Sequence, residues 1–185
     1  MPRFTRSFTC LLLLALAHAA DAANAGATDK RYSLPGHGAL ALKIPAGWKD
    51  KVEQPEATKP PTISFGTADG NPFIVTVSPI WGEGVTSPPG GKTLRENVER
   101  ARHGIEAFAV EKELKIREFK GASGPGFYFT ATDAALTPGG YKFLTKGSLR
   151  VGAIEVAFVI LTNDGQQKVV RDALSMLRTA AQVQD

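Results

Sequence analysis

Residues 153–161, with the sequence AIEVAFVIL, constrain the fold more than any other stretch of the chain. The segment is apolar except for Glu155, and it is rich in β-branched and aromatic side chains. An apolar run of this length and composition is typical of a strand that is covered on both faces of a sheet. The turn residues Asn163, Asp164 and Gly165 then end it. We therefore predict a central strand with other elements packed on both sides.

Shorter segments supply the rest of the predicted sheet. Leu and Ile alternate with Ala and Lys over residues 40–44, and this period of two predicts a strand with one buried face. Residues 63–65 and 73–77 flank a Gly-Asn-Pro turn, which predicts a hairpin. The charged alternation of residues 113–117 favours an edge strand, because charges there discourage unwanted pairing. Further strands are expected at residues 126–132 and 141–151.

Two amphipathic helices are predicted. Thr93 followed by Glu96 fits a capping box, in which the Thr hydroxyl accepts the N–H of Glu96 and the Glu carboxylate accepts the N–H of Thr93. Glu96 and Arg100 have the spacing of a favourable surface ion pair. The second helix is expected over residues 166–181. The apolar stripe of the first helix recurs at steps of four and three: Leu94, Val98, Ala101, Ile105 and Phe108.

The loop before the first helix, residues 78–91, raises the question of a phosphate-binding loop because it ends in Gly-Gly-Lys-Thr. That motif requires a glycine five residues before Gly91, and Thr86 occupies the position. Pro88 and Pro89 also lack the backbone N–H groups that would hold phosphates. We therefore interpret the stretch as the start of a capped helix and predict no nucleotide.

The N-terminus, residues 1–22, has the pattern of a secretory signal peptide. Arg3 and Arg6 precede an apolar stretch centred on residues 11–16, and small-x-small motifs follow that place cleavage after Ala19 or Ala22. An uncleaved anchor is the alternative, although the run is shorter than the roughly 20 residues of a membrane span. Cleavage removes Cys10, the single cysteine. We expect a periplasmic or secreted protein without a later membrane span.

Net charge and chain length limit which other classes of protein the chain can belong to. The chain has 185 residues and a net charge of +4, and its basic residues are mixed with acidic ones along the sequence. Nucleic-acid binding is not expected, because no basic run with interleaved aromatics occurs. A mature chain of about 160 residues suits one domain. We predict a disordered lead-in over residues 23–31 and a single α+β domain over residues 32–185, with an antiparallel sheet sandwiched by helices.

The stretch LALKIPAGWKD resembles the start of PsbP-like domains, with a strand, Pro45, Gly47 and Trp48 in that order. The order that follows is also similar: a hairpin, a mid-chain helix, long strands and a closing helix containing ALSML. The resemblance covers residues 32–181 and implies an α/β/α sandwich. It further implies a non-catalytic role in binding other proteins, because that is how most members of this family work.

A search for catalytic and metal-binding patterns assigns no catalytic, cofactor or metal residue. His37 lies between glycines and is interpreted as a turn residue, and His103 lies off the apolar stripe of its helix. Neither has a second histidine at helical spacing for a metal. Ser123 precedes a strand, unlike the nucleophile of Gly-x-Ser-x-Gly enzymes. The acidic candidates are dispersed in the sequence, so a pair in space stays open: Asp133, Glu155 and Asp164.

Trp81 and Glu83, in the Gly/Pro-rich loop, are the candidate partner-binding residues. A tryptophan there can anchor a partner, or it can cover the core beneath its own loop; Trp48 is expected to be core. Two functions stay open: a non-catalytic module that binds an envelope protein or a small ligand, and a small exported hydrolase or transferase. Three carboxylate or histidine residues converging in one pocket would favour the enzyme. A flat apolar patch near Trp81 would favour the binding module.

Overall fold

The computed structural model describes residues 26–68, 73–82 and 88–184. The predicted signal peptide, the Gly-Asn-Pro turn at 70–72 and the candidate residue Glu83 lie outside the described residues. These residues form an α+β fold with two antiparallel sheets and two helices. The elements are β1 (Thr28–Ser33), β2 (Ala39–Ile44), β3 (Trp48–Glu53), β4 (Thr62–Thr67), β5 (Ile74–Ile80), α1 (Gly91–Glu106), β6 (Arg117–Lys120), β7 (Pro125–Thr132), β8 (Phe143–Val151), β9 (Ile154–Thr162), α2 (Gln167–Arg178) and β10 (Ala181–Val183).

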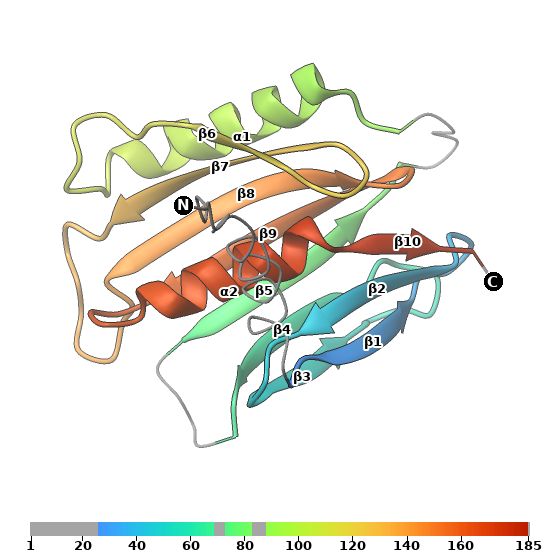
Figure 1. The fold of residues 1–185 in the computed structure, drawn as a ribbon. Helices are drawn as coiled ribbons and strands as arrows, with labels where there is room; N and C mark the ends of the chain where they lie inside the picture. The colour runs from blue at the N-terminus through green and yellow to red at the C-terminus, as the bar shows by residue number, and fades with distance from the viewer. Residues whose placement is uncertain (1–25, 69–72, 83–87, 185) are drawn as a thin grey trace, which may run out of the picture.

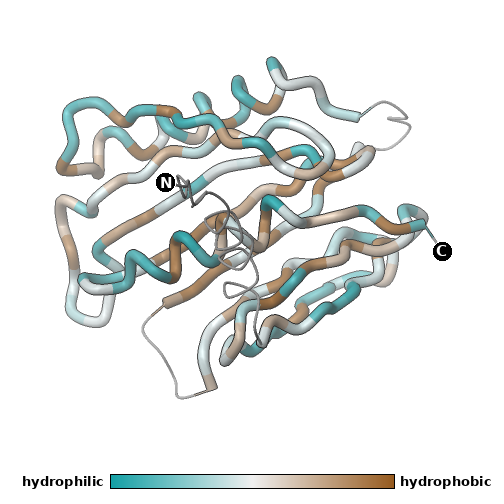
Figure 2. The backbone as a smooth tube through the Cα atoms, viewed as in Figure 1, coloured by the Kyte–Doolittle hydropathy of each residue, from teal (hydrophilic) through white to brown (hydrophobic). Residues whose placement is uncertain are grey.

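The larger sheet has seven strands in the order β3-β4-β5-β9-β8-β7-β6, so β9 is its central strand, as predicted. Every second side chain of β9 lies on the same face of the strand and is buried: Ile154, Val156, Phe158 and Ile160. Hydrophobic residues run along this strand and its neighbour β5 in Figure 2. The predicted hairpin is confirmed, because β4 pairs with β5 through Phe65 and Val75.

One face of the large sheet is covered by α2 and by the small sheet, whose order is β1-β2-β10 (Figure 1). Their apolar residues join β9 in the main core, where Leu40, Leu42 and Leu177 pack with Val156 and Phe158. The opposite face carries α1. A second core forms there between α1 and the β7 end of the sheet, and its buried residues are Leu94, Val98, Leu114, Phe127, Phe129 and Ala131.

The first helix is present, but the predicted cap and end are wrong. Gly90 is the N-cap and α1 begins at Gly91, so Thr93 lies inside the first turn, and the helix has no side-chain cap hydrogen bond. The helix ends at Glu106, where the chain turns and the N–H of Phe108 donates to the carbonyl of Ile105. Ala109 then forms an isolated antiparallel β-bridge with Asp133. Phe108 therefore leaves the apolar stripe and is 69% exposed.

The ion pairs on α1 also differ from the prediction. Glu96 pairs with Lys92 at 3.8 Å, and Arg95 pairs with Glu99 at 3.1 Å. Arg100 donates to the side-chain oxygen of Asn97 at 3.3 Å instead of pairing with Glu96. Arg100 is thereby held on the side of α1 that carries Asn97.

Most of the remaining differences between the predicted and the observed elements concern strands that carry charged residues. Residues 28–31, expected in a disordered lead-in, belong to β1, which pairs along its whole length with β2. The charged segment 48–53 forms the edge strand β3. The edge strand expected at 113–117 begins only at Arg117. The closing helix stops at Arg178, and the chain then pairs with β2 as β10.

Candidate functional site

The face of the large sheet that carries α1 is covered only in part by the described elements. α1 packs against β7 and β8, while β5 and β9 present a row of half-buried or exposed side chains on the same face. Ile74 is 37% and Ile80 is 45% exposed. We call this surface the open half-face. Its floor consists of Ser64, Ile74, Thr76, Ser78, Ile80, Ala157, Val159 and Leu161.

The strand register brings these residues together from distant parts of the chain. Thr76 lies opposite Ser64 on β4 and opposite Val159 on β9. Val159 in turn lies opposite Lys146 on β8. Residues directly opposite each other in antiparallel strands share a face of the sheet. The floor is therefore built of small hydroxyl-bearing and aliphatic side chains, with larger Ile side chains at its two ends on β5.

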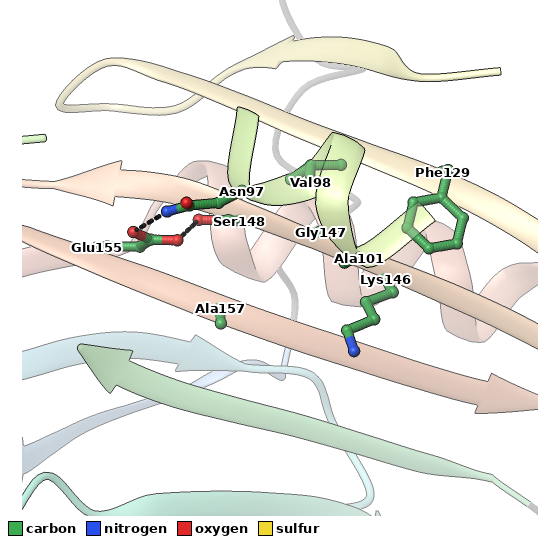
Figure 3. A pocket seen from close by; sticks show the side chains of 9 residues that line it. All are labelled: Asn97, Val98, Ala101, Phe129, Lys146, Gly147, Ser148, Glu155 and Ala157. Carbon is green, nitrogen blue, oxygen red and sulfur yellow. Dashed lines mark hydrogen bonds between the residues drawn. The ribbon is translucent and has the colours of Figure 1, made fainter. Parts of the chain in front are cut away.

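A small pocket lies between the open half-face and α1 (Figure 3). Its volume is about 80 Å³. Ligand sites for small organic molecules are usually several hundred Å³. The pocket is therefore of the size of a few water molecules. Its lining residues are Asn97, Val98, Ala101, Phe129, Lys146, Gly147, Ser148, Glu155 and Ala157.

The Glu155 carboxylate joins α1 to the sheet in this pocket. The hydroxyl of Ser148 donates to Oε1 at 2.5 Å, and the side-chain amide of Asn97 donates to Oε2 at 2.9 Å. Figure 3 shows both groups directed at the carboxylate, whereas Lys146 points away from it. Each oxygen of Glu155 thus has a donor, which offsets the cost of placing a charged group at the edge of an apolar core.

The same geometry limits what the pair Ser148 and Glu155 can do chemically. Ser148 is 3% exposed, so its hydroxyl is not accessible to a substrate. A serine nucleophile needs an adjacent base and donors for the developing oxyanion. Glu155 is the one carboxylate among the described residues that line the pocket, and no histidine lines it there. The convergence of three acidic or histidine residues that would favour an enzyme does not occur in this pocket.

Cations border the open half-face on both sides. Lys49 and Lys51 are exposed on the edge strand β3, where Lys51 pairs with Glu53 at 2.6 Å. Lys49 lies opposite Gly66 of β4 and Lys51 opposite Ser64, so both share the face of the floor. On the other side stand Arg100 of α1 and Lys146 of β8. Among the described residues, Lys49, Arg100 and Lys146 form no ion pair.

Trp81 lies directly after β5, on the side of the main core and the small sheet. It is half-buried, packs against the main core and lies with its ring centroid 4.5 Å from that of His37. His37 occupies the turn between β1 and β2, as predicted, and its carbonyl accepts a hydrogen bond from Gln182 at 2.9 Å. Trp81 therefore contacts the core and retains partial exposure. Trp48 is also half-buried and packs on Phe73, at 5.0 Å between ring centroids.

The other residues singled out in the sequence take part in separate contacts. His103 is a surface residue, as interpreted, and approaches Glu106 at 3.1 Å. The side chain of Asp133 accepts the N–H of Ala135, and Asp164 pairs with Lys142. The carbonyl of Ser123 accepts hydrogen bonds from Arg150. Within the described residues, no three His, Cys, Asp or Glu side chains gather in a group that could hold a metal.

The hydrogen bond between Lys51 and Glu53 on β3 raises the pKa of Lys51 and lowers the pKa of Glu53. Three further side chains have pKa values shifted by burial and hydrogen bonds. The hydrogen bond from Lys30 lowers the pKa of Asp50, which joins β1 to β3. Burial and the hydrogen bond to Asp50 raise the pKa of Tyr32. Burial alone would raise the pKa of Glu111, but the hydroxyl and N–H of Thr132 both donate to this carboxylate and hold its pKa below the usual value. The last three groups fasten strands and loops together, away from the open half-face.

Sequence comparison gives no relative for this chain. No protein-family model matches it, and no curated protein matches it with significant similarity. In the described part of the chain, neither helix is both long and apolar enough to cross a membrane. The α+β class and the open half-face are established by the structure itself.

Proposed function

We propose that the chain is an exported, PsbP-like envelope protein that binds another protein as a non-catalytic accessory module. The observation that carries this proposal is the open half-face: a floor of aliphatic and hydroxyl side chains that the described elements leave uncovered beside α1. Exposed surfaces with aliphatic side chains side by side often mark sites of protein interaction. Ile80 ends the floor, and the indole of the next residue, Trp81, packs on the other face against the main core and His37.

A protein suits this surface better than a small ligand. The pocket beside the floor holds about 80 Å³, which is too little for most organic ligands. The floor itself extends along β5 and β9, whereas a small molecule needs an enclosed site for most of its surface. The arrangement of two helices on opposite faces of an antiparallel sheet is compatible with the PsbP-like sandwich that the Pro45-Gly47-Trp48 corner suggests.

Site-specific photocrosslinking tests the proposed function. A photoreactive amino acid replaces Ser78, which is half-buried on the floor, and in a second variant replaces Thr130, which is exposed on β7 on the other face. We expect the Ser78 variant to give a discrete crosslinked protein in the envelope and the Thr130 variant to give none. Equal crosslinking from both positions, or none from Ser78, would refute binding at the open half-face.

Export is tested separately by the intact mass of the protein after secretion. The N-terminal pattern of Arg3, Arg6, an apolar stretch and small residues supports cleavage after Ala19 or Ala22. The mature protein is expected to begin within a few residues of Ala20. A full-length protein retained in the cytoplasm would contradict this part of the proposal.

A further inference from the structure

We infer that the open half-face docks an amphipathic helix of a partner protein, with acidic residues on both sides of its apolar stripe, in a position next to α1. This inference rests on the proposed function and specifies the chemistry of the partner. Three features support it: the spacing of the strands, the shape of the floor and the charges at its borders.

The spacing of the strands leaves room for one helix beside α1. α1 packs over β7 and β8, and the next two strands in the sheet are β9 and β5. Neighbouring strands lie about 4.8 Å apart, so the line between β9 and β5 is displaced by about 10 Å from the line between β7 and β8. Packed helices have axes about 8–10 Å apart. A helix centred over β9 and β5 would therefore pack on the sheet and against α1 at the same time.

The shape of the floor matches one side of a short helix. β5 has seven residues from Ile74 to Ile80, and at about 3.4 Å per residue it spans roughly 20 Å, the length of a helix of about 14 residues. The middle of the floor is formed by the small side chains of Thr76, Ser78 and Ala157. The Ile side chains stand at its ends. A helix with small or medium apolar residues at its centre would lie flat on such a surface.

The charges at the borders favour an acidic partner. Lys49 stands on the β3 side of the floor, next to the ion pair of Lys51 with Glu53, and Arg100 and Lys146 stand on the α1 side. The acidic groups beside the floor already have partners: Glu53 pairs with Lys51, and Glu155 accepts hydrogen bonds from Ser148 and Asn97. Acidic side chains on both flanks of the docked helix would meet cations on both sides.

A second copy of this chain fits the surface less well. Two open half-faces packed against each other would bring the cations of one copy close to those of the other. Like charges placed against each other oppose association. We therefore assign the surface to a different protein, and self-association becomes one of the outcomes that the experiment can detect.

The test uses the whole protein and a displayed library of helical peptides of about four turns. Each peptide carries apolar residues at the helical spacing i, i+3, i+4 and i+7, and the flanking positions contain Glu, Lys, Ser or Gln in equal amounts. We expect the selected peptides to be enriched in Glu on both flanks. Enrichment of Lys, absence of enrichment, or loss of the helical spacing would overturn the inference.

Three variants locate the selected peptides. Thr76→Arg places a long cation on the floor, and Thr130→Arg makes the same change on the other face of the sheet, on β7. We expect Thr76→Arg to weaken peptide binding by tenfold or more, and Thr130→Arg to leave it unchanged. The double variant Lys49→Glu/Lys146→Glu should weaken Glu-flanked peptides by about tenfold and improve Lys-flanked ones. Equal effects of the two Arg variants would contradict docking at the floor.

Failure of this inference is distinguishable from failure of the proposed function. If the variant with the photoreactive amino acid at position 78 crosslinks a protein but the library yields no acidic helices, the surface binds a partner of another kind. If Ser78 crosslinks only a second copy of the chain, a dimer replaces the proposed partner. If Ser78 crosslinks nothing, the proposed function fails together with the inference.

Discussion

The ring of His37 lies against the indole of Trp81, with 4.5 Å between their centroids and 40° between their planes. His37 belongs to the turn of the small sheet, whereas Trp81 follows β5 of the large sheet. The contact therefore joins the two sheets at one end of the molecule.

A double-mutant cycle should detect coupling between these two rings. Offset aromatic pairs contribute about 0.5–1.5 kcal/mol beyond the area they bury. We expect His37→Ala and Trp81→Ala to be less than additive by this amount when the free energy of unfolding is measured with urea. His103→Ala serves as the control, because His103 is a surface residue that contacts Glu106. Full additivity would show that the rings do not interact in solution.

The Trp81→Ala variant also shows whether Trp81 binds the partner or only stabilises the core. Trp81 is half-buried against the main core, so we expect a loss of about 2 kcal/mol, roughly half of the 3–5 kcal/mol typical of a buried aromatic. If Trp81 anchors the partner, the same variant loses partner crosslinking from Ser78 under conditions where it remains folded. A loss of stability above about 4 kcal/mol with unchanged crosslinking would assign Trp81 to the core alone.

Gly90→Asp should stabilise the protein. Gly90 is the N-cap of α1 with φ −71°, a backbone conformation open to any residue, and a side-chain Cβ at this position would meet no atom within 4 Å. The first turn of α1 has no acidic residue. An Asp side chain would cap the free N–H groups and interact with the helix dipole, for a gain of about 0.5–1 kcal/mol in the free energy of unfolding.

Gly36→Asp is the matched control for that variant. Its Cβ would also meet open space, but Gly36 has φ +73°, which strains any side-chain-bearing residue. We expect a lower melting temperature for Gly36→Asp and a higher one for Gly90→Asp. Thr93→Ala should change stability by less than about 0.5 kcal/mol, because Thr93 makes no capping hydrogen bond. A lowered melting temperature for Gly90→Asp would contradict the helix start at Gly91.

Acidification should weaken the contact between β1 and β3. The pKa of Asp50 is lowered in the folded protein, mainly by the hydrogen bond from Lys30. An unfolded Asp has a pKa of about 3.9. The stabilisation is therefore complete above that pH and is lost as the pH falls through the lower, folded pKa. We expect Asp50→Asn to lose less stability than the wild type between neutral pH and pH values below about 4.

Two lysine variants control this prediction. Lys30→Met removes the donor to Asp50 and should reduce the acid sensitivity of the melting temperature. Lys43→Met, on β2, changes an exposed lysine without a described ion pair and should leave it unchanged. The same acid dependence in the wild type and in Lys30→Met would show that Asp50 does not carry the effect.

Removal of the Glu155 carboxylate should destabilise the attachment of α1 to the sheet. Glu155→Ala leaves the buried hydroxyl of Ser148 without its acceptor, which costs about 1–3 kcal/mol. Glu155→Gln keeps an acceptor oxygen and should lose less. Glu96→Ala is the control, since its pair with Lys92 is exposed and long at 3.8 Å and contributes at most about 1 kcal/mol. Urea denaturation followed by circular dichroism measures all three.

The sequence predicted the buried elements better than the charged ones. β9 was correctly assigned to the centre of the large sheet from its apolar run. Cover on both of its faces was also predicted, but the described elements leave part of its α1 side open. β1 and β3 were missed because residues such as Asp29, Lys30 and Lys51 are exposed and give no apolar period. Phe108 was wrongly placed on the helix, because it continued the spacing of the stripe although the chain had already turned toward Asp133.

The open half-face could not be predicted for a different physical reason. Thr76, Val159 and Lys146 are neighbours only through strand register, and register between distant strands leaves no local pattern. The same holds for the hydrogen bonds from Asn97 and Ser148 to Glu155. The acidic pair that the sequence left open among Asp133, Glu155 and Asp164 does not form, because these residues take part in separate contacts. A charged residue within an otherwise apolar strand was the one signal that pointed to this place.

The pairing of β10 with β2 has a consequence for how the polypeptide folds. β2 lies near the beginning of the described chain and β10 near its end, so the small sheet is complete only when both are available. The hydrogen bonds from Gln182 to His37 and from Ala153 to Gln182 add to the same closure. Contacts between residues so distant in sequence slow folding, because a long loop must close before they form. The small sheet therefore cannot be completed in a nascent chain until β10 has been synthesised.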